Sequence, residues 1–218
     1  MIKKMLWSLL LLAATQVQAK EILFIGNSIT LHAPKQSIGW NGNWGMAASG
    51  ANTDYAARLA AYLKQAESAA DFNITRINLS GIEREAAYQF DIKTVQRLAN
   101  HYDYIVIFLG DNVSVKNNQN LTDFSSNLEQ LLARLPRDDA SVIFVSTWWS
   151  SATVDRLLKK LSTLNGACFV DISGLSAHPE FTASFSSPQV NPDVGKHPSD
   201  AGMDQIARKI AKQLSIIK

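Results

Sequence analysis

Short apolar runs alternate with helix-spaced apolar positions along this chain of 218 residues. Apolar runs at 21–26, 103–110, 141–146 and 167–172, and an alternating stretch at 73–80, predict five strands. Helical spacing predicts helices at 53–68, 87–101, 121–135, 153–164 and from Ser199 to Ile217. Apolar runs that do not alternate are typical of strands covered on both faces. We therefore expect one three-layer α/β/α domain with about five parallel strands.

Polar or aromatic residues follow each predicted strand. The first strand is followed by Asn27 and Ser28, the second by Ser80 and Gly81, the third by Gly110, Asp111 and Asn112, and the fourth by Thr147, Trp148 and Trp149. The fifth strand leads into a loop that carries His178 and His197. Because ligands of parallel sheets bind outside the carboxyl ends of the strands, these residues predict a functional site at that edge.

The first nineteen residues differ from the rest of the chain. Lys3 and Lys4 precede an apolar segment at 5–14, and Val17-Gln18-Ala19 resembles a small-residue cleavage site. The apolar segment is shorter than the roughly 20 residues needed to span a bilayer. We expect a cleaved signal peptide at 1–19 and an exported protein, periplasmic or secreted, with no integral membrane segment after cleavage. A retained N-terminal anchor is the alternative.

The net charge and the cysteine content argue against a nucleic-acid partner and against an internal disulfide. The formal net charge of +2 falls by two when Lys3 and Lys4 are removed, giving 2 − 2 = 0. No cluster of basic residues with interleaved aromatics is present, so nucleic acid is not an expected partner.

Cys168 is the only cysteine and lies in an apolar run. We expect no internal disulfide and a buried structural thiol at this position.

Ser28 is the candidate nucleophile. Acyl transfer needs a nucleophile, a base within hydrogen-bond reach, and donors aimed at the developing oxyanion. The sequence has no G-x-S-x-G, so it lacks the nucleophile elbow of α/β-hydrolases. Ser28 would still be suitable if a helix began there, because a helix N-terminus has free N–H groups. The alternative is that Ser28 only caps a turn.

Four segments resemble the sequence blocks of the GDSL/SGNH hydrolase superfamily, in order. "FIGNSIT" resembles the first block, with Asn27 where the founding motif has Asp, and "HPSDAGM" resembles the last. "NLSG" and "FLGDN" resemble the second and third. The resemblance spans about residues 22–210 and implies a flavodoxin-like SGNH architecture. It implies that Ser28 is the nucleophile, His197 the base, and Ser28, Gly81 and Asn112 the oxyanion donors.

The position three residues before His197 departs from this family. The family usually has Asp there, and this chain has Val194, with Asp193 one residue earlier. Either Asp193 orients the imidazole through a bulge, or a backbone carbonyl does so and the site is a dyad. Asp193 could equally be a loop residue that caps a turn. We expect Asp200 in the first turn of the last helix, where a carboxylate is favoured.

The resemblance implies a serine esterase mechanism that uses no metal and no cofactor. Ser28 would attack an ester carbonyl while His197 takes its proton, and water would then release the acid. His32, His101 and His178 are too scattered to suggest a set of metal ligands. We expect them at the surface or in loops.

Tryptophans suggest a carbohydrate substrate. Trp40, Trp44, Trp148 and Trp149 could form flat apolar faces on which sugars pack. Packing in the core is the alternative for each of them. We add Asn27 and Glu83 as candidate substrate-binding residues. A solvated helix start would explain Glu83 and its neighbour Arg84 equally well.

The leading hypothesis is an exported serine esterase that removes short acyl groups, chiefly acetyl, from a small-molecule or polysaccharide ester. A lipid-directed esterase, lysophospholipase or thioesterase is a second hypothesis, although the Asn-rich loops do not suggest an acyl trench. An acyltransferase and a glycan-binding protein with an inactive site are the others. The departure at Val194 is the one feature that favours the binding protein.

Overall fold

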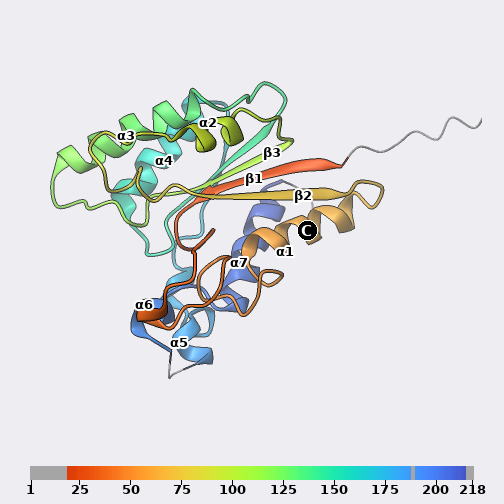
Figure 1. The fold of residues 1–218 in the computed structure, drawn as a ribbon, viewed down its shortest axis with the longest axis vertical. Coiled ribbons are helices and arrows are strands. Elements are labelled where there is room, and N and C mark those ends of the chain that lie inside the picture. The colour runs from red at the N-terminus through yellow and green to blue at the C-terminus, as the bar shows by residue number, and fades with distance from the viewer. Residues whose placement is uncertain (1–18, 188–189, 215–218) are drawn as a thin grey trace, which may run out of the picture.

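The computed structural model describes residues 19–187 and 190–214, so the predicted signal segment 1–19 lies almost wholly outside the described residues. The chain forms a sheet with helices on both faces (Figure 1). Five strands pair in the order β2-β1-β3-β4-β5, and every pair is parallel. The predicted three-layer α/β/α fold is therefore confirmed.

The five predicted strands are present. They are β1 (Lys20–Gly26), β2 (Phe72–Asn78), β3 (Tyr104–Phe108), β4 (Ser141–Val145) and β5 (Cys168–Val170). At the end of β1, Gly26 pairs with Asn78 of β2 and with Phe108 of β3. The carboxyl ends of these three strands are therefore level, and the loops after them start side by side. β1 lies between β2 and β3, the next two strands in the chain, so the order of the strands reverses at β1. Folds of this kind bind ligands at that reversal.

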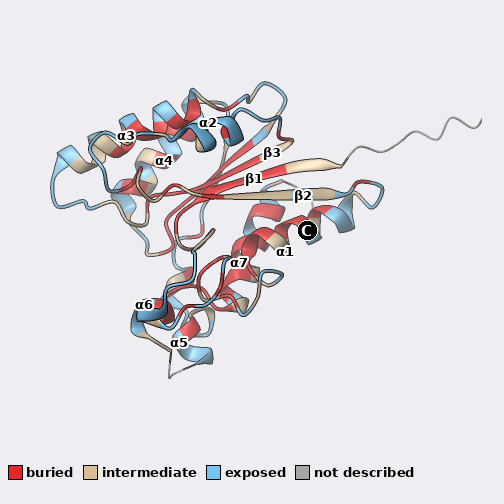
Figure 2. Cartoon of the chain, in the orientation of Figure 1, coloured by how far each residue is buried: buried red, intermediate tan, exposed pale blue. Residues whose placement is uncertain are grey.

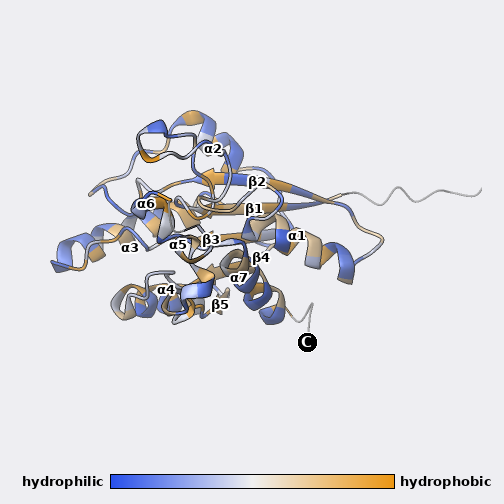
Figure 3. Ribbon diagram, turned by 90° about the horizontal axis from the view of Figure 1, so that it is seen from below, coloured by the Kyte–Doolittle hydropathy of each residue, from blue (hydrophilic) through white to orange (hydrophobic). Residues whose placement is uncertain are grey.

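Helices cover both faces of the sheet. They are α1 (Tyr55–Ala66), α2 (Ile92–Leu98), α3 (Asn118–Leu132), α4 (Ala152–Leu164) and α7 (Asp200–Gln213). One core cluster joins the sheet to α1 and α7, and a second joins its other face to α2, α3 and α4. The buried strands and the sheet-facing sides of the helices are visible in Figure 2, and the polar outer faces in Figure 3.

The second predicted helix is shorter than its apolar pattern suggested. We predicted 87–101, but α2 begins after Asp91, whose side chain accepts from the amide of Thr94. The preceding segment instead packs against α3: Tyr88 N–H donates to Asn127 Oδ1, and the Tyr88 and Phe90 rings meet edge to face. The apolar residues at 87–90 belong to a packed loop, although their spacing predicted the first turn of a helix.

The loop after β5 folds into short helical segments that the sequence did not predict. They are η2 (Leu175–Ala177), η3 (Pro179–Phe181), α5 (Ala183–Ser186) and α6 (Pro192–Gly195). In Figure 1, α5 and α6 lie with the long loop after β1, which contains η1 (Gln36–Ile38), below the carboxyl ends of the strands. This arrangement brings the C-terminal part of the chain to the residues that follow β1.

Cys168 is half-buried rather than buried, because β5 is a short strand at the edge of the sheet.

The last helix starts with Ser199 as its N-cap, and Asp200 lies in its first turn as predicted. Its predicted end at Ile217 falls outside the described residues. Across the described part of the chain, we find no helix with the length and apolar character required to cross a bilayer.

Candidate active site

Ser28 and His197 meet at the carboxyl edge of the sheet. Ser28 Oγ lies 2.8 Å from His197 Nε2, although 169 residues separate them in the sequence. Ser28 follows β1 in a turn closed by bonds from the amides of Thr30 and Leu31 to the carbonyl of Asn27. We considered a helix start at this position, but the structure has this single turn instead.

Glycine is required immediately before this turn. A Cβ at Gly26 would lie only 1.9 Å from Thr30 Oγ1 and 2.8 Å from the carbonyl oxygen of Phe108. The side chain of Asn27, in turn, accepts from the amide of Ile29. Ser28 is therefore not the cap of this turn: Asn27 fills that role, and the hydroxyl of Ser28 is left to face His197.

The C-terminal loop fixes the position of His197. The amide of His197 donates to the carbonyl of Val194, and its own carbonyl accepts from the amide of Ala183. An antiparallel bridge between Thr182 and Pro198 closes the loop on the other side. The imidazole is held between these contacts and is only 5% exposed.

Burial keeps His197 neutral. It lowers the pKa of the imidazole to about 4, and the nearby side chains of Lys196 and His32 act in the same direction. The backbone carbonyls of Asp193 and Val194 oppose this shift of the pKa. At pH 7 the ring is therefore unprotonated, which is the form a general base needs.

Asp193 does not orient His197, which corrects one expectation. Its carboxylate lies 3.1 Å from Lys196 Nζ, and its side chain is 70% exposed. Its backbone N–H is bound by Asn191, the cap of α6. His197 Nδ1 is buried and has no hydrogen-bond partner among the described residues. Ser28 and His197 thus pair without a carboxylate bound to the ring among the described residues, the arrangement expected of a dyad.

Two tryptophans hold the residue that precedes His197. The indole N–H groups of Trp148 and Trp149 both donate to the carbonyl of Lys196, at 3.1 and 3.3 Å. The Trp149 ring also meets the His197 ring edge to face, with centroids 5.1 Å apart. The backbone N–H of Trp149 is bound in turn by Asp111 Oδ1, at 3.1 Å. The loop after β4 therefore clamps the His197 loop.

Asn112 is held between two charged side chains. Its amide nitrogen donates to Glu83 Oε2, and its amide oxygen accepts from Arg84, both at 2.5 Å. One amide hydrogen remains for a ligand in the cleft, because the nitrogen carries two. The backbone N–H groups of Ser28 and Gly81 donate to no acceptor among the described residues. These three groups are the predicted oxyanion donors.

Glu83 and Asn27 support the site from beneath and do not line the cleft, contrary to our expectation. Glu83 is 4% exposed, and its Oε1 accepts from the amide of Gly110 at 2.6 Å and from Asn27 Nδ2 at 3.1 Å. Asn27 is fully buried and cannot contact a substrate. A turn after β1 and a turn after β3 are thus tied to one buried carboxylate.

Asp111 is a site residue to which the sequence analysis gave no role. Its carboxylate lies near Asn27 Nδ2, at 3.4 Å, and faces the same cleft as Ser28. Burial, together with the neighbouring negative charge of Glu83, raises the pKa of Asp111 to about 7. Its position inside "LGDN", directly before Asn112, was the available sequence signal.

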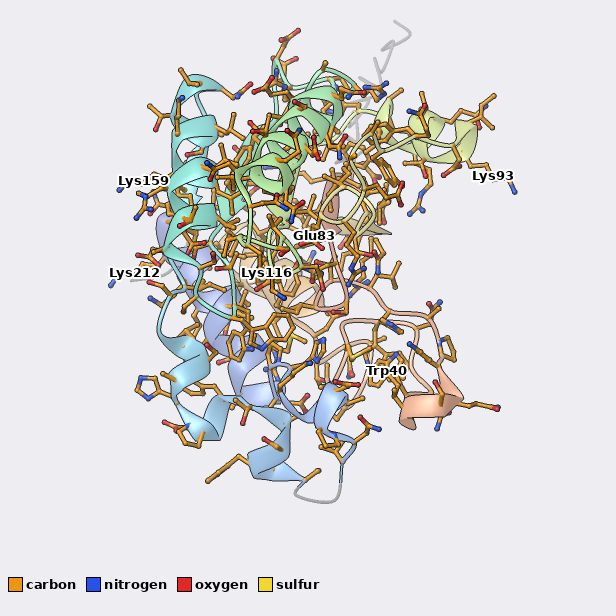
Figure 4. All side chains as sticks on the ribbon, turned by 90° about the vertical axis from the view of Figure 1, so that its left-hand side faces the viewer. Trp40, Glu83, Lys93, Lys116, Lys159 and Lys212 are labelled. Carbon is orange, nitrogen blue, oxygen red and sulfur yellow. The ribbon has the colours of Figure 1, made fainter. Side chains whose placement is uncertain are left out.

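Three of the four candidate sugar-binding tryptophans belong to the core or to loop packing. Trp148 is fully buried, and Trp40 is 7% exposed and packs with Met46 and Val194. Trp44 meets Trp40 edge to face and donates to the carbonyl of Ala48. Trp40 lies far from Glu83 in Figure 4. Only Trp149 lines the cleft. Trp148 packs in the core, and Trp40 and Trp44 pack within the loop after β1.

The cleft around Ser28 has a volume of about 490 Å³ and a largely polar wall. Its apolar side chains are Ile38, Met46 and Trp149. The polar side chains include Lys35, Asn78, Ser80, Arg84 and His32. We refer to this space as the Ser28 cleft. His32 therefore lies at the site rather than at an unrelated surface position, whereas His101 and His178 are exposed elsewhere.

Comparisons with known proteins identify the fold. No family model matches the sequence, and no curated protein sequence is significantly similar to it. A two-domain esterase active on acetylated mannans matches 90% of this chain with 16% identity and a TM-score of 0.58, and this chain spans 49% of that protein. A GDSL-like lipase from Parabacteroides merdae matches 92% of this chain and 98% of its own, with 17% identity and a TM-score of 0.58.

A family two carbohydrate esterase from Cellvibrio japonicus matches 93% of this chain, with 16% identity and a TM-score of 0.54. This chain spans 63% of that protein. Each of these matches spans at least 90% of this chain, and so includes its parallel sheet and flanking helices. The chain thus has the three-layer fold found in GDSL-like lipases and carbohydrate esterases.

Proposed function

We propose that this protein is a serine esterase of the GDSL/SGNH type that removes short acyl groups, chiefly acetyl, from carbohydrate. The observation that carries the proposal is the 2.8 Å contact between Ser28 Oγ and His197 Nε2 in an open cleft. A hydroxyl beside a neutral, buried imidazole is the arrangement that general-base activation of a serine requires.

The geometry supports the usual two-step course of acyl transfer. His197 takes the proton of Ser28 as its Oγ attacks the ester carbonyl, and the tetrahedral oxyanion binds the donors of Ser28, Gly81 and Asn112. The imidazolium then protonates the leaving alcohol, and an acyl-serine remains. Water, activated by the same imidazole, releases the carboxylic acid. Each step uses groups that line or border the Ser28 cleft.

The wall of the cleft supports a small acyl group on a polar alcohol. A long acyl chain needs an apolar channel, because its stabilisation comes from burying CH₂ groups at about 0.8 kcal/mol each. Three apolar side chains contribute to the wall of the Ser28 cleft among the described residues. Two of the similar structures are a mannan-directed esterase and a carbohydrate esterase, which is consistent with this substrate class.

The test is release of acetate from acetylated polysaccharides and from 4-nitrophenyl acetate by the purified protein. We expect Ser28→Ala and His197→Ala to reduce kcat by about 10³-fold or more, because the dyad acts as a unit. 4-Nitrophenyl esters of long fatty acids should be poor substrates. Hydrolysis that persists in Ser28→Ala, or the absence of hydrolysis in the unchanged protein, would refute the proposal.

We also propose that the protein is exported. The basis is the sequence of residues 1–19, in which a basic start, an apolar segment and a small-residue cleavage site follow one another. We expect the protein recovered from the periplasm or the medium of a bacterial host to begin at Lys20. N-terminal sequencing would show this, and a cell-associated protein that still begins at Met1 would contradict it.

A further inference from the structure

The Ser28 cleft adjoins a second, smaller pocket. This pocket has a volume of about 250 Å³ and shares Arg84 and Asn112 with the Ser28 cleft. Its remaining wall consists of Glu83, Glu85, Ala86, Ser114, Asn120 and Asp123. We call it the second pocket. It lies between the segment after β2 and the first turns of α3, directly beside the predicted oxyanion donor Asn112.

The wall of the second pocket is rich in hydrogen-bond acceptors that receive no hydrogen bond from the part of the chain that the structure describes. One oxygen of Asp123 accepts from Gln119 at 2.7 Å, whereas the other has no donor among the described residues. The side-chain amide nitrogen of Asn120 donates to the carbonyl of Ser114, and its side-chain oxygen accepts no hydrogen bond from the described residues. The carboxylate of Glu85 also receives no hydrogen bond from the described part of the chain. Ala86 is the one apolar side chain of this wall.

These acceptors fit a ligand that carries several hydroxyl groups. An O–H that donates to a carboxylate forms a charge-assisted bond, stronger than a bond between neutral groups. An acyl chain would instead remove these carboxylates from water without offering them a donor, which is costly. The guanidinium of Arg84, on the boundary of the two pockets, can donate to a ring or glycosidic oxygen.

We propose that the second pocket binds a sugar residue adjacent to the acylated one, so that the enzyme prefers oligosaccharide esters to monosaccharide esters. This inference rests on the proposed esterase function and adds a subsite to it. It also explains how a cleft lined by one half-buried indole among the described residues, that of Trp149, would recognise carbohydrate: through hydrogen bonds to hydroxyls more than through stacking.

The test compares three acetyl esters: 4-nitrophenyl acetate, an acetylated monosaccharide and an acetylated trisaccharide of the same sugar. For the unchanged protein we expect a higher kcat/KM per acetyl group on the trisaccharide than on the monosaccharide, which has the same kind of leaving alcohol. Asp123→Ala should raise KM for the trisaccharide about tenfold, the typical effect of one hydrogen bond to a charged group. Its kcat, and its activity on the two small esters, should change less than about twofold.

Glu129→Ala is the matched control, because it removes an exposed carboxylate from the same helix at a position outside the pocket. Asp123→Asn, which retains the shape of the side chain, provides a second variant if Asp123→Ala folds poorly. Equal kcat/KM on monosaccharide and trisaccharide, or equal KM in Asp123→Ala and Glu129→Ala, would overturn the subsite. If the unchanged protein did not hydrolyse 4-nitrophenyl acetate, that result would instead refute the proposed esterase function.

Discussion

At this site, the pKa and the contacts of a side chain depend more on its surroundings than on its residue type. His197 is an ordinary histidine in sequence, but burial lowers its pKa to about 4. Glu83 resembles a surface residue in "GIERE", but it is buried and accepts from Gly110 and from Asn112. Both properties arise from contacts with residues far away in the chain.

The pH dependence of catalysis should report the burial of His197. In the proposed mechanism the unprotonated ring is the active form, so kcat/KM should be constant near pH 6 and fall to half at about pH 4. Initial rates with 4-nitrophenyl acetate between pH 3 and pH 8 would measure this. Samples returned to pH 7 control for acid denaturation, and Asp111→Asn controls for the second group whose pKa is shifted. A half-maximal value near 6.5 in Asp111→Asn would contradict a buried, depressed base.

Glu83 should matter to kcat, because it fixes the amide of Asn112. In Glu83→Gln, one carboxylate oxygen becomes an NH₂ group that cannot accept from its donors. We expect kcat to fall about tenfold with little change in KM, less than the 10²–10³-fold loss of an oxyanion donor. Steady-state kinetics beside the exposed control Glu129→Gln would measure it. If both variants retained full kcat, Glu83 would have no positioning role.

At the level of elements, the loop after β4 takes over part of the role that an orienting aspartate would have. Trp148 and Trp149 share the carbonyl of Lys196, and Asp111 binds the backbone of Trp149. The His197 loop is thereby fixed to the ends of β3 and β4. This arrangement shows how the imidazole can be held although Asp193 points to Lys196.

Trp149→Phe tests this clamp, because it removes the indole N–H but retains a ring beside His197. We expect kcat to fall roughly threefold to tenfold, in line with a hydrogen bond of about 1 kcal/mol. The acid limb of the pH profile should also move upward from about pH 4, because a looser loop lets water reach the ring. Trp44→Phe is the control, since it loses an equivalent bond to the carbonyl of Ala48. Identical profiles for the two variants would argue against the clamp.

At the scale of the whole molecule, an ion pair between a buried aspartate and a half-buried arginine joins three parts of the fold. Asp54 is fully buried, caps α1 through the amide of Ala57, and lies 2.8 Å from Arg76 of β2. It also accepts from the amide of Gly45, in the long loop that follows Ser28. The position of the loop thus depends on a carboxylate shared by a helix and a strand.

Asp54→Ala should destabilise the protein strongly, because it leaves the guanidinium of Arg76, whose side chain is only 18% exposed, without its carboxylate partner. We expect the free energy of unfolding to fall by about 3–5 kcal/mol. Asp91→Ala is a matched comparison: Asp91 also caps a helix, but it is exposed, so its loss should lower the free energy of unfolding by much less. Urea denaturation would measure both. Equal losses would mean that capping, and not the ion pair, accounts for the role of Asp54.

The sequence by itself determined the strands, their alternation with helices, and the position of Ser28 and Asn112 after β1 and β3. These features follow from local patterns, because an apolar run covered on both faces can be recognised without knowledge of what covers it. The exact start of α2 and the short helices before His197 did not follow, because they depend on packing against distant segments.

Only the tertiary structure decided the roles of side chains at the site. It placed Trp40 and Trp148 in packing positions, turned Asp193 toward Lys196, and put Glu83 beneath Asn112. Each of these residue types could have occurred either at the surface of the site or in the interior of the protein. Which role a polar or aromatic side chain adopts depends on the partners that distant parts of the chain bring to it, since burial without a partner is costly.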